Sequence, residues 1–320
     1  MRLLLLVNTS ASSVTARSRV VIQKALAADH ELTTAETSRR GHAARLAQGA
    51  SATGVDAVVV LGGDGTLSEA ANGLAGSATA LGILPGGSTN VFARTVGMSN
   101  DPIEATGQLL SALARQSTRR VSLGNVNGRY FLFHVGMGFD AAVVEQVERR
   151  ATLKRYAGHG LFVYAALATF LRHYDRSRPR FAVRYGPKVH SGPDQAEPGS
   201  TPAVIDDAYL AVCLKTNPYT FLGNRPLNLA PEASFDTGLS LVTFRSLDFV
   251  TVVGVVLSSL RRGPRRHQTH GRRVVHVGDR DDIVVTGYGP FPYQVDGDYL
   301  GQAESLHLRH VPDALTLLVP

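Results

Sequence analysis

The first 125 residues alternate short apolar runs with stretches of helical periodicity. The apolar runs predict strands at Leu3–Val7, Asp56–Leu61 and Ala80–Leu84. The periodic stretches predict helices at Ala16–Ala28, Ala43–Ala50, Thr66–Leu74 and Ile103–Arg115, with a short helix from Asn90. Because the strands are continuously hydrophobic, they indicate parallel strands covered on both faces. The pattern therefore predicts a doubly wound α/β domain over residues 1–125.

From residue 126 onward the pattern changes to short strand-like runs separated by turns. We predict strands at Tyr130–Met137, Phe181–Tyr185, Asp207–Leu214, Leu239–Phe244, Arg273–Val277 and Asp282–Thr286. Helices are predicted at Ala141–Arg150, Gly160–His173 and Leu247–Leu260. The stretch 187–202 is rich in Pro, Gly and Ser and predicts an exposed loop. We expect a mainly antiparallel β-sandwich domain over residues 126–320, with the option that its last strand returns to the first domain.

The composition indicates the cellular environment that the chain is expected to occupy. Among 320 residues there is a single cysteine, Cys213, which excludes a disulfide framework and a cysteine metal cage. A reducing, cytoplasmic environment is the simplest interpretation. The apolar stretch 161–171 is shorter than the roughly 20 residues that a membrane-spanning helix needs.

The formal net charge of +7 is unevenly distributed. Residues 149–188 contain ten Arg and Lys with one acidic residue, and residues 261–280 contain seven Arg with one acidic residue. Two basic segments favour docking onto something anionic: a membrane surface, a nucleic acid or a phosphorylated ligand. The alternative is that both segments are simply solvated surface. The basic segments carry few paired aromatics, and no helix-turn-helix or zinc signature is present, so nucleic acid is disfavoured.

The strongest local motif is a glycine turn between a buried strand and a helix. Gly62-Gly63-Asp64-Gly65 follows the strand directly, and the helix starts at once. Such a turn presents backbone N–H groups to a phosphate. Thr66 and Glu69 have the spacing of a capping box. An acid beside phosphates requires a cation between them, so Asp64 implies Mg²⁺; the alternative is a tight turn in which Asp64 is a turn former.

A second turn of the same kind, Pro85-Gly86-Gly87-Ser88-Thr89-Asn90, follows the next strand. Neither turn is a Walker A loop or a GxGxxG fingerprint. Two glycine turns at the carboxyl ends of successive strands lie where open α/β sheets bind ligands. Together they predict a nucleotide site.

These residues resemble the diacylglycerol kinase catalytic domain of bacterial lipid kinases, which is related to sphingosine and ceramide kinases. The resemblance rests on GGDGTLSEAANGL (62–74) and LPGGSTNVFAR (84–94). Further matches, in family order, are Val7-Asn8, Thr37–Ala43, Val135–Ala141, Ala233–Leu239 and Gln294–Asp298. The resemblance implies ATP-dependent transfer of a phosphoryl group to a lipid hydroxyl, with diacylglycerol as the default acceptor and phosphatidic acid as the product.

The resemblance also implies the roles of individual residues. Those expected to line the ATP site are Asn8, Thr37, Gly62, Gly63, Asp64, Gly65, Thr66, Leu67, Ser68, Gly87, Ser88 and Asn90. Asp64 would act with Mg²⁺ at the phosphates, and Asp140 and Asp236 are further candidate metal ligands. Asp298 would be the general base, with Asp296 as a second catalytic carboxylate. Without the family, a hairpin turn is the favoured interpretation of Asp296-Gly297-Asp298.

Several positions depart from the family pattern. Asp298 replaces the usual Glu, Val91 replaces an Asp in the second loop, and His134 stands where Asn is more usual. Related kinases bind a structural Mg²⁺ through the Asp of an Asp-Gly-Leu turn. Thr237 stands at that position here, with Asp236 one residue early, so the sequence leaves this second metal open.

A cytoplasmic lipid kinase working at an anionic membrane surface is the leading hypothesis. The stretch Leu153–Leu171, with its basic flanks, is typical of an interfacial amphipathic element, and the arginines of 261–273 would add charge attraction. An NAD kinase-like enzyme is the alternative enzyme class, because it shares the GGDG turn. A third hypothesis is a catalytically weak regulator that binds nucleotide or lipid. A homodimer is compatible with the sequence.

Overall fold

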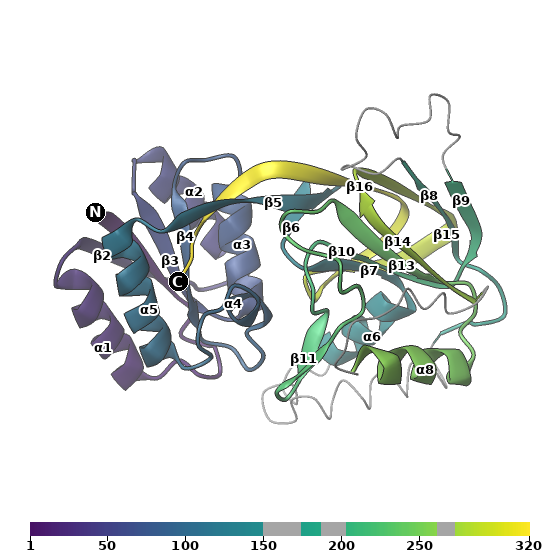
Figure 1. Cartoon of the computed structure of the whole chain (residues 1–320), viewed down its shortest axis with the longest axis horizontal. Coiled ribbons are helices and arrows are strands. Elements are labelled where there is room, and N and C mark those ends of the chain that lie inside the picture. Colours follow the sequence, from purple (N-terminus) through teal and green to yellow (C-terminus); the bar gives the residue numbers. More distant parts are fainter. Residues whose placement is uncertain (150–173, 187–202, 261–272) are drawn as a thin grey trace. The chain divides into compact units, whose positions relative to one another are not determined.

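The computed structural model describes residues 1–149, 174–186, 203–260 and 273–320 (Figure 1). The chain divides into two compact units: residues 1–123 with 311–320 form unit 1, and residues 124–310 form unit 2. The predicted helix Gly160–His173, the amphipathic stretch Leu153–Leu171, the loop 187–202 and the arginines of 261–272 lie outside the described residues. Within the described ranges, no helix has the length and hydrophobicity needed to span a bilayer.

Unit 1 is built on a parallel sheet. Its strands are β1 (Arg2–Val7), β2 (Glu31–Glu36), β3 (Ala57–Gly62), β4 (Ala80–Pro85) and the C-terminal part of β16 (Asp298–Leu318). They are hydrogen-bonded in the order β2-β1-β3-β4-β16. Every residue of β3 and β4 is buried, as the continuous hydrophobic runs predict. The doubly wound α/β fold is confirmed.

The helices of unit 1 cover both faces of this sheet (Figure 1). They are α1 (Ala16–Ala27), α2 (His42–Ala52), α3 (Asp64–Leu74), α4 (Val91–Thr95) and α5 (Pro102–Arg115). Helix α1 packs against α5, and α2 packs against α3. The second pair is very close: a Cβ atom at Gly73 would lie 2.2 Å from the Ala44 carbonyl oxygen. Glycine at this position therefore lets α3 approach α2 closely.

Unit 2 is mainly antiparallel β structure. Its strands are β5 (Thr118–Val126, entering from unit 1), β6 (Arg129–Phe131), β7 (His134–Gly138), β8 (Phe181–Tyr185), β9 (Ala203–Ala208), β10 (Leu210–Leu214), β11 (Thr220–Leu222), β12 (Arg225–Leu227), β13 (Leu239–Phe244), β14 (Val274–Arg280), β15 (Asp282–Val295) and the first part of β16. The helices described here are α6 (Phe139–Glu148) and α8 (Phe249–Ser259). Strands β14-β13-β10-β7-β15 are neighbours in that order, and β8 joins the other half of β15.

Alternate residues of the central strands enter two different hydrophobic cores. In β10, Ala211 and Cys213 belong to a core with residues of β8, β15 and β16. Leu210, Val212 and Leu214 belong to a second core, on the side covered by α6 and α8. This period-two alternation is what a sheet packed on both faces requires. The mainly antiparallel sandwich character of unit 2 is confirmed, and burial raises the pKa of the Cys213 thiol, as expected of a small core residue.

The hydrophobic pattern did not predict β2, β5, β11, β12 and β16, and the strands predicted at Tyr130–Met137 and Asp207–Leu214 are each divided into two in the structure. Strand β2 is an edge strand with four of its six residues exposed, so it has no apolar run to detect. Strand β16 is 21 residues long and mixes polar and apolar positions, because different segments of it pair with β15 and with β4.

Candidate active site

The carboxyl ends of the parallel strands bring the predicted nucleotide residues of unit 1 to one edge of the sheet. Asn8 follows β1, Thr37 follows β2, and the two glycine turns follow β3 and β4. Strands β3 and β4 are paired through Gly62 and Pro85 at their last residues. The two turns are therefore neighbours, as predicted for a ligand-binding edge.

The two glycine turns pack directly on one another. A Cβ atom at Gly86 would lie 2.9 Å from Gly62 Cα, and a Cβ atom at Gly87 would lie 2.9 Å from Gly63 Cα. The Gly86 N–H donates to the Gly62 carbonyl at 2.8 Å. These glycines are required for backbone packing before any ligand is considered.

The N-terminus of α3 carries no side-chain cap. Its N-cap is Gly63, and the predicted capping box between Thr66 and Glu69 is wrong. Glu69 instead accepts hydrogen bonds from the backbone N–H groups of Gly41 (2.7 Å) and Ala43 (3.2 Å) at the start of α2. The first turn of α3 thus presents its backbone N–H groups to an incoming group, and a Cβ atom at Gly65 would have no atom within 4 Å.

Asp64 ties the first turn to the second. Its two carboxylate oxygens accept hydrogen bonds from the backbone N–H groups of Val91 (2.9 Å) and Phe92 (3.1 Å) at the start of α4. Burial raises the pKa of Asp64, and these two N–H groups act in the opposite direction. Besides the role at Mg²⁺ that the resemblance implies, this carboxylate holds the second glycine turn in place.

The other predicted ATP residues of unit 1 divide into exposed and buried positions. The Asn8 side-chain amide donates to Thr66 Oγ1 at 2.8 Å, joining the end of β1 to α3. Asn90 closes its own turn through the backbone N–H and carbonyl of Gly87. Ser88 is exposed, whereas Leu67 and Ser68 are buried, so these two residues support the turn from behind.

In unit 2, Asp296 holds a neighbouring chain segment. Its carboxylate accepts hydrogen bonds from the backbone N–H groups of Leu132 (3.0 Å), Phe133 (2.9 Å) and His134 (3.2 Å). The side chain is buried, and the backbone of Asp296 is left-handed with φ of 51°. Three backbone donors around one carboxylate are the signature of an anchoring role.

Asp298 is more accessible than Asp296. Its side chain is 23% exposed, and Oδ2 accepts a hydrogen bond from Arg129 Nη2 at 3.0 Å. The next residue, Tyr299, donates its backbone N–H to Glu148 Oε1 at 3.2 Å. Of the two carboxylates in this turn, Asp298 is the more exposed.

A third carboxylate, Asp140, lies in a polar network of unit 2. Its oxygens accept hydrogen bonds from Tyr219 Oη (2.6 Å) and Gln294 Nε2 (2.8 Å). The His134 ring stacks on Tyr219 with centroids 4.4 Å apart. Burial lowers the pKa of His134, while the charges of Asp140 and Asp296 raise it. Both carboxylate oxygens of Asp140 therefore accept hydrogen bonds from protein donors, which hold the side chain in place without a metal.

Sequence reasoning missed Arg129, Tyr219 and Gln294 as partners of these carboxylates. Arg129 and Tyr219 lie 169 and 79 residues from the carboxylates that they contact, in stretches without a motif. Gln294 is the first residue of the motif Gln294–Asp298. Of these three residues it is therefore the one that a motif could have indicated.

The described residues fit Mg²⁺ only together with phosphates. Within these residues, no cluster of three or more His, Cys, Asp or Glu side chains could hold a metal ion. Mg²⁺ is commonly bound by one or two carboxylates plus the phosphates of a substrate. Asp64, beside the uncapped helix N-terminus, fits that arrangement.

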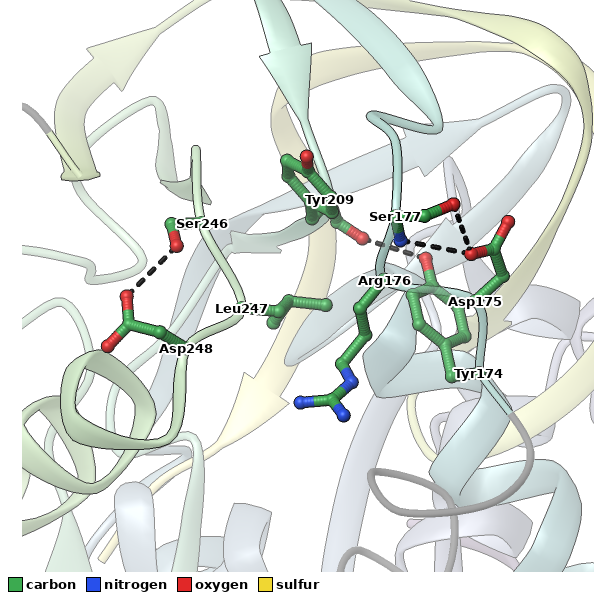
Figure 2. Close-up of a pocket in the computed structure, with 8 residues that line it drawn as sticks. All are labelled: Tyr174, Asp175, Arg176, Ser177, Tyr209, Ser246, Leu247 and Asp248. Carbon is green, nitrogen blue, oxygen red and sulfur yellow. Dashed lines mark hydrogen bonds between the residues drawn. The ribbon is translucent and has the colours of Figure 1, made fainter.

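A hollow of about 560 Å³ lies elsewhere in unit 2 (Figure 2). Its wall consists of Tyr174, Asp175, Arg176, Ser177, Tyr209, Ser246, Leu247 and Asp248. Tyr174 Oη donates to the Tyr209 carbonyl at 2.8 Å, and Asp175 accepts from the backbone N–H and hydroxyl of Ser177. The hollow shares no residue with the predicted site and lies at the start of α8.

Comparisons with known proteins agree with the motifs. Residues 2–126 match the family model described as diacylglycerol kinase catalytic domain. A protein of Chromohalobacter salexigens named "Probable lipid kinase YegS-like" is 36% identical over 148 residues, which is 45% of this chain and 46% of that protein. The diacylglycerol kinase of Bacillus subtilis is 36% identical over 121 residues, 37% of this chain and 39% of that protein. The resemblance predicted from the sequence is confirmed, and the matched stretches span less than half the length of these two relatives.

Solved structures share the whole fold. A putative diacylglycerol kinase from Bacillus anthracis superposes with a TM-score of 0.72 over 100% of this chain and 97% of that chain, at 21% sequence identity. This likeness in fold includes the residues beyond 126, where the family model stops.

Proposed function

We propose that this chain, whose residues 2–126 match the diacylglycerol kinase catalytic domain, transfers the γ-phosphoryl group of ATP to the hydroxyl group of a membrane lipid. The observation that carries the proposal is the uncapped N-terminus of α3 beside two interlocked glycine turns, with open space at Gly65. Backbone N–H groups and the helix dipole there favour phosphate. The names of the relatives give the acceptor class.

The proposed reaction gives separate roles to the first turn of α3, to Asp64 and to Asp298. The first turn of α3 binds and orients the phosphates, and Asp64 keeps the second glycine turn in place beside it. The lipid oxygen forms a bond to the γ-phosphorus as the bond between that phosphorus and the β,γ-bridging oxygen breaks, and ADP leaves. Asp298 accepts the hydroxyl proton, and Arg129 orients its carboxylate. Asp64 would hold Mg²⁺ together with the phosphates, and the metal would supply positive charge to the phosphoryl oxygens.

Diacylglycerol is the proposed acceptor, and phosphatidic acid the product. The assay is transfer of ³²P from [γ-³²P]ATP to a panel of diacylglycerol, sphingosine, ceramide and NAD. Label in phosphatidic acid supports the proposal. Label confined to NADP would replace it with the NAD kinase-like alternative, and binding of ATP without transfer to any acceptor would favour the regulator.

Substituting Gly65 by alanine is expected to weaken ATP binding without harming the fold. The added Cβ atom meets no protein atom, so it changes only the surface that the phosphates approach. Alanine also favours a helix by at most about 1 kcal/mol. We expect the KM for ATP to rise roughly tenfold, which corresponds to about 1.4 kcal/mol. The matched control is Gly107→Ala in α5, another helical glycine with no atom within 4 Å. Equal KM values in both variants would place the phosphates elsewhere.

We also propose that the enzyme works peripherally at an anionic membrane, and α8 supports this. The helix has the sequence FVTVVGVVLSS, without a charged residue, and Asp248 caps its N-terminus by accepting from the Thr251 N–H. Phe249 is 58% exposed and Val250 is 77% exposed, and Val256 and Leu257 are exposed as well. The hollow of Figure 2 adjoins this end of the helix, with Arg176 in its wall. The wall of the hollow also contains Asp175 and Asp248, so the support comes from the exposed apolar face of α8, which is suited to the lipid interface.

The double variant Phe249→Ser/Val250→Ser is expected to lose vesicle binding. Removing two apolar side chains from the interface should cost about 2–3 kcal/mol, or roughly a thirtyfold or greater fall in partitioning. Sedimentation with vesicles containing an anionic phospholipid measures the change. The matched control is Val204→Ser, an exposed valine (59%) on β9. If both variants bind as the unmodified protein does, α8 is not the contacting element. If the unmodified protein binds neutral and anionic vesicles equally, electrostatic attraction does not contribute to its membrane binding.

A further inference from the structure

The turn that leads into β13 does not fit the divalent metal that the resemblance implies there. Thr237 stands at the position of the ligating Asp, and its hydroxyl is used inside the turn. Thr237 Oγ1 accepts a hydrogen bond from the Ser234 N–H at 3.1 Å and lies 3.3 Å from the carbonyl oxygens of Glu232 and Ser234. The turn is therefore closed by a neutral side chain where a carboxylate would be needed to hold Mg²⁺.

A lysine ammonium occupies the centre of this turn instead. Lys215, directly after β10, has 0% of its surface exposed. Its Nζ donates to the carbonyl oxygens of Ser234 at 2.8 Å and Thr237 at 2.5 Å. Lysine is almost never fully buried unless it is paired, so this arrangement requires specific compensation. The two converging carbonyl oxygens supply it.

Negative charge surrounds the same ammonium. Burial lowers the pKa of Lys215 to about 8, while the carboxylates of Asp236 and Asp279 act in the opposite direction. Asp279 also binds the turn itself, because its Oδ1 accepts the Gly238 N–H at 2.7 Å. Carbonyl and carboxylate oxygens around a point positive charge are the surroundings that a hard metal cation would also select. Two cations cannot share them, since a metal among these oxygens would meet the ammonium within a few ångströms.

We infer that the ammonium of Lys215 is the resident cation of the 234–239 turn, in place of a divalent metal, and that this turn is held without Mg²⁺. The inference does not rest on the proposed function.

The position matters because the same residue adjoins the candidate catalytic turn. The Lys215 N–H donates to the Phe133 carbonyl at 2.7 Å, and Thr216 Oγ1 donates to the Leu132 carbonyl at 3.0 Å. Asp296 holds the N–H groups of these same two residues. Lys215 thus links the 234–239 turn, through its ammonium, to the segment next to Asp296, through its backbone N–H, and this link needs no metal.

The test replaces the Lys215 ammonium by Mg²⁺ and measures the melting temperature in the absence of nucleotide. Unmodified protein should show the same melting temperature in EDTA and in excess MgCl₂. Lys215→Met, which removes the ammonium donor from both carbonyl oxygens, should melt at least about 5 °C lower. The double variant Lys215→Ala/Thr237→Asp removes the ammonium and restores the carboxylate, so MgCl₂ should raise its melting temperature by about 3–5 °C.

The matched control is Thr237→Asp alone. It keeps the ammonium, so it should remain insensitive to MgCl₂. The inference would be overturned if MgCl₂ raised the melting temperatures of Thr237→Asp and of the double variant equally. It would also be overturned if Lys215→Met were as stable as the unmodified protein. If the double variant does not fold, the metal content of the purified unmodified protein decides: about one divalent ion per chain after nucleotide-free dialysis would overturn the inference, and none would support it.

Discussion

Replacing Asp298 by asparagine should lower kcat by roughly 10²–10⁴, the range for loss of a general base, with little change in the KM for ATP. Asparagine keeps the shape of the side chain and its contact with Arg129, but it cannot accept the hydroxyl proton. The ion pair that it replaces is partly exposed, and such pairs contribute about 0–1 kcal/mol. The melting temperature should therefore fall by no more than about 3 °C. Single-turnover transfer to diacylglycerol vesicles, read beside a thermal melt, measures both effects.

Asp296→Asn is the matched comparison, and it should behave in the opposite way. The Asp296 carboxylate accepts three backbone N–H groups, and hydrogen bonds to a charged group contribute about 1.5–3 kcal/mol each. An amide in its place turns one acceptor into a donor, so we expect a fall in melting temperature of about 5 °C or more. If Asp296→Asn is stable but inactive while Asp298→Asn transfers phosphate normally, Asp296 is the base.

Asp64→Ala should reduce kcat/KM for ATP by about 10²–10³, as expected when a stabiliser of phosphoryl charge is removed. It should also lower stability, because the buried N–H groups of Val91 and Phe92 lose their acceptor at about 1–3 kcal/mol each. A variant with more than half of normal activity would exclude both roles.

Asp64→Asn separates the two roles. The amide oxygen can still accept one of the two N–H groups, while the charge that attracts Mg²⁺ is gone. If Asp64 is a metal ligand, raising the MgCl₂ concentration should restore part of the lost rate. An Mg²⁺ titration curve with an unchanged midpoint would leave Asp64 with its loop-holding role alone.

The sequence predicted β1, β3 and β4 of unit 1 well because these strands are uninterrupted apolar runs, and glycine turns mark the ends of β3 and β4. It failed where a residue serves a distant partner. Glu69 has the spacing to cap α3 but caps α2 instead, because α2 lies against α3 and its N-terminus is within reach. Spacing along one helix carries no information about such a neighbour.

In unit 2 the sequence identified the carboxylates but not their different environments. Asp296 and Asp298 are two residues apart and look equivalent in a motif. The three N–H donors around Asp296 come from residues more than 160 positions earlier, and so does Arg129, the partner of Asp298. Similarly, nothing in the local pattern around Lys215 indicates that its ammonium ends among the carbonyl groups of residues 234–237.

The return of β16 to the parallel sheet has a consequence for how the protein is made. Thr316 and Leu317 pair with Ala80 and Leu81 of β4, and Leu315 and Leu317 are fully buried. These residues leave the ribosome only after all of 124–310 has been synthesised. Until then β4 exposes an unpaired edge, the feature by which sheets aggregate. Unit 1 therefore cannot complete its sheet until residues 124–310 have been synthesised, and unit 2 has the time to fold first.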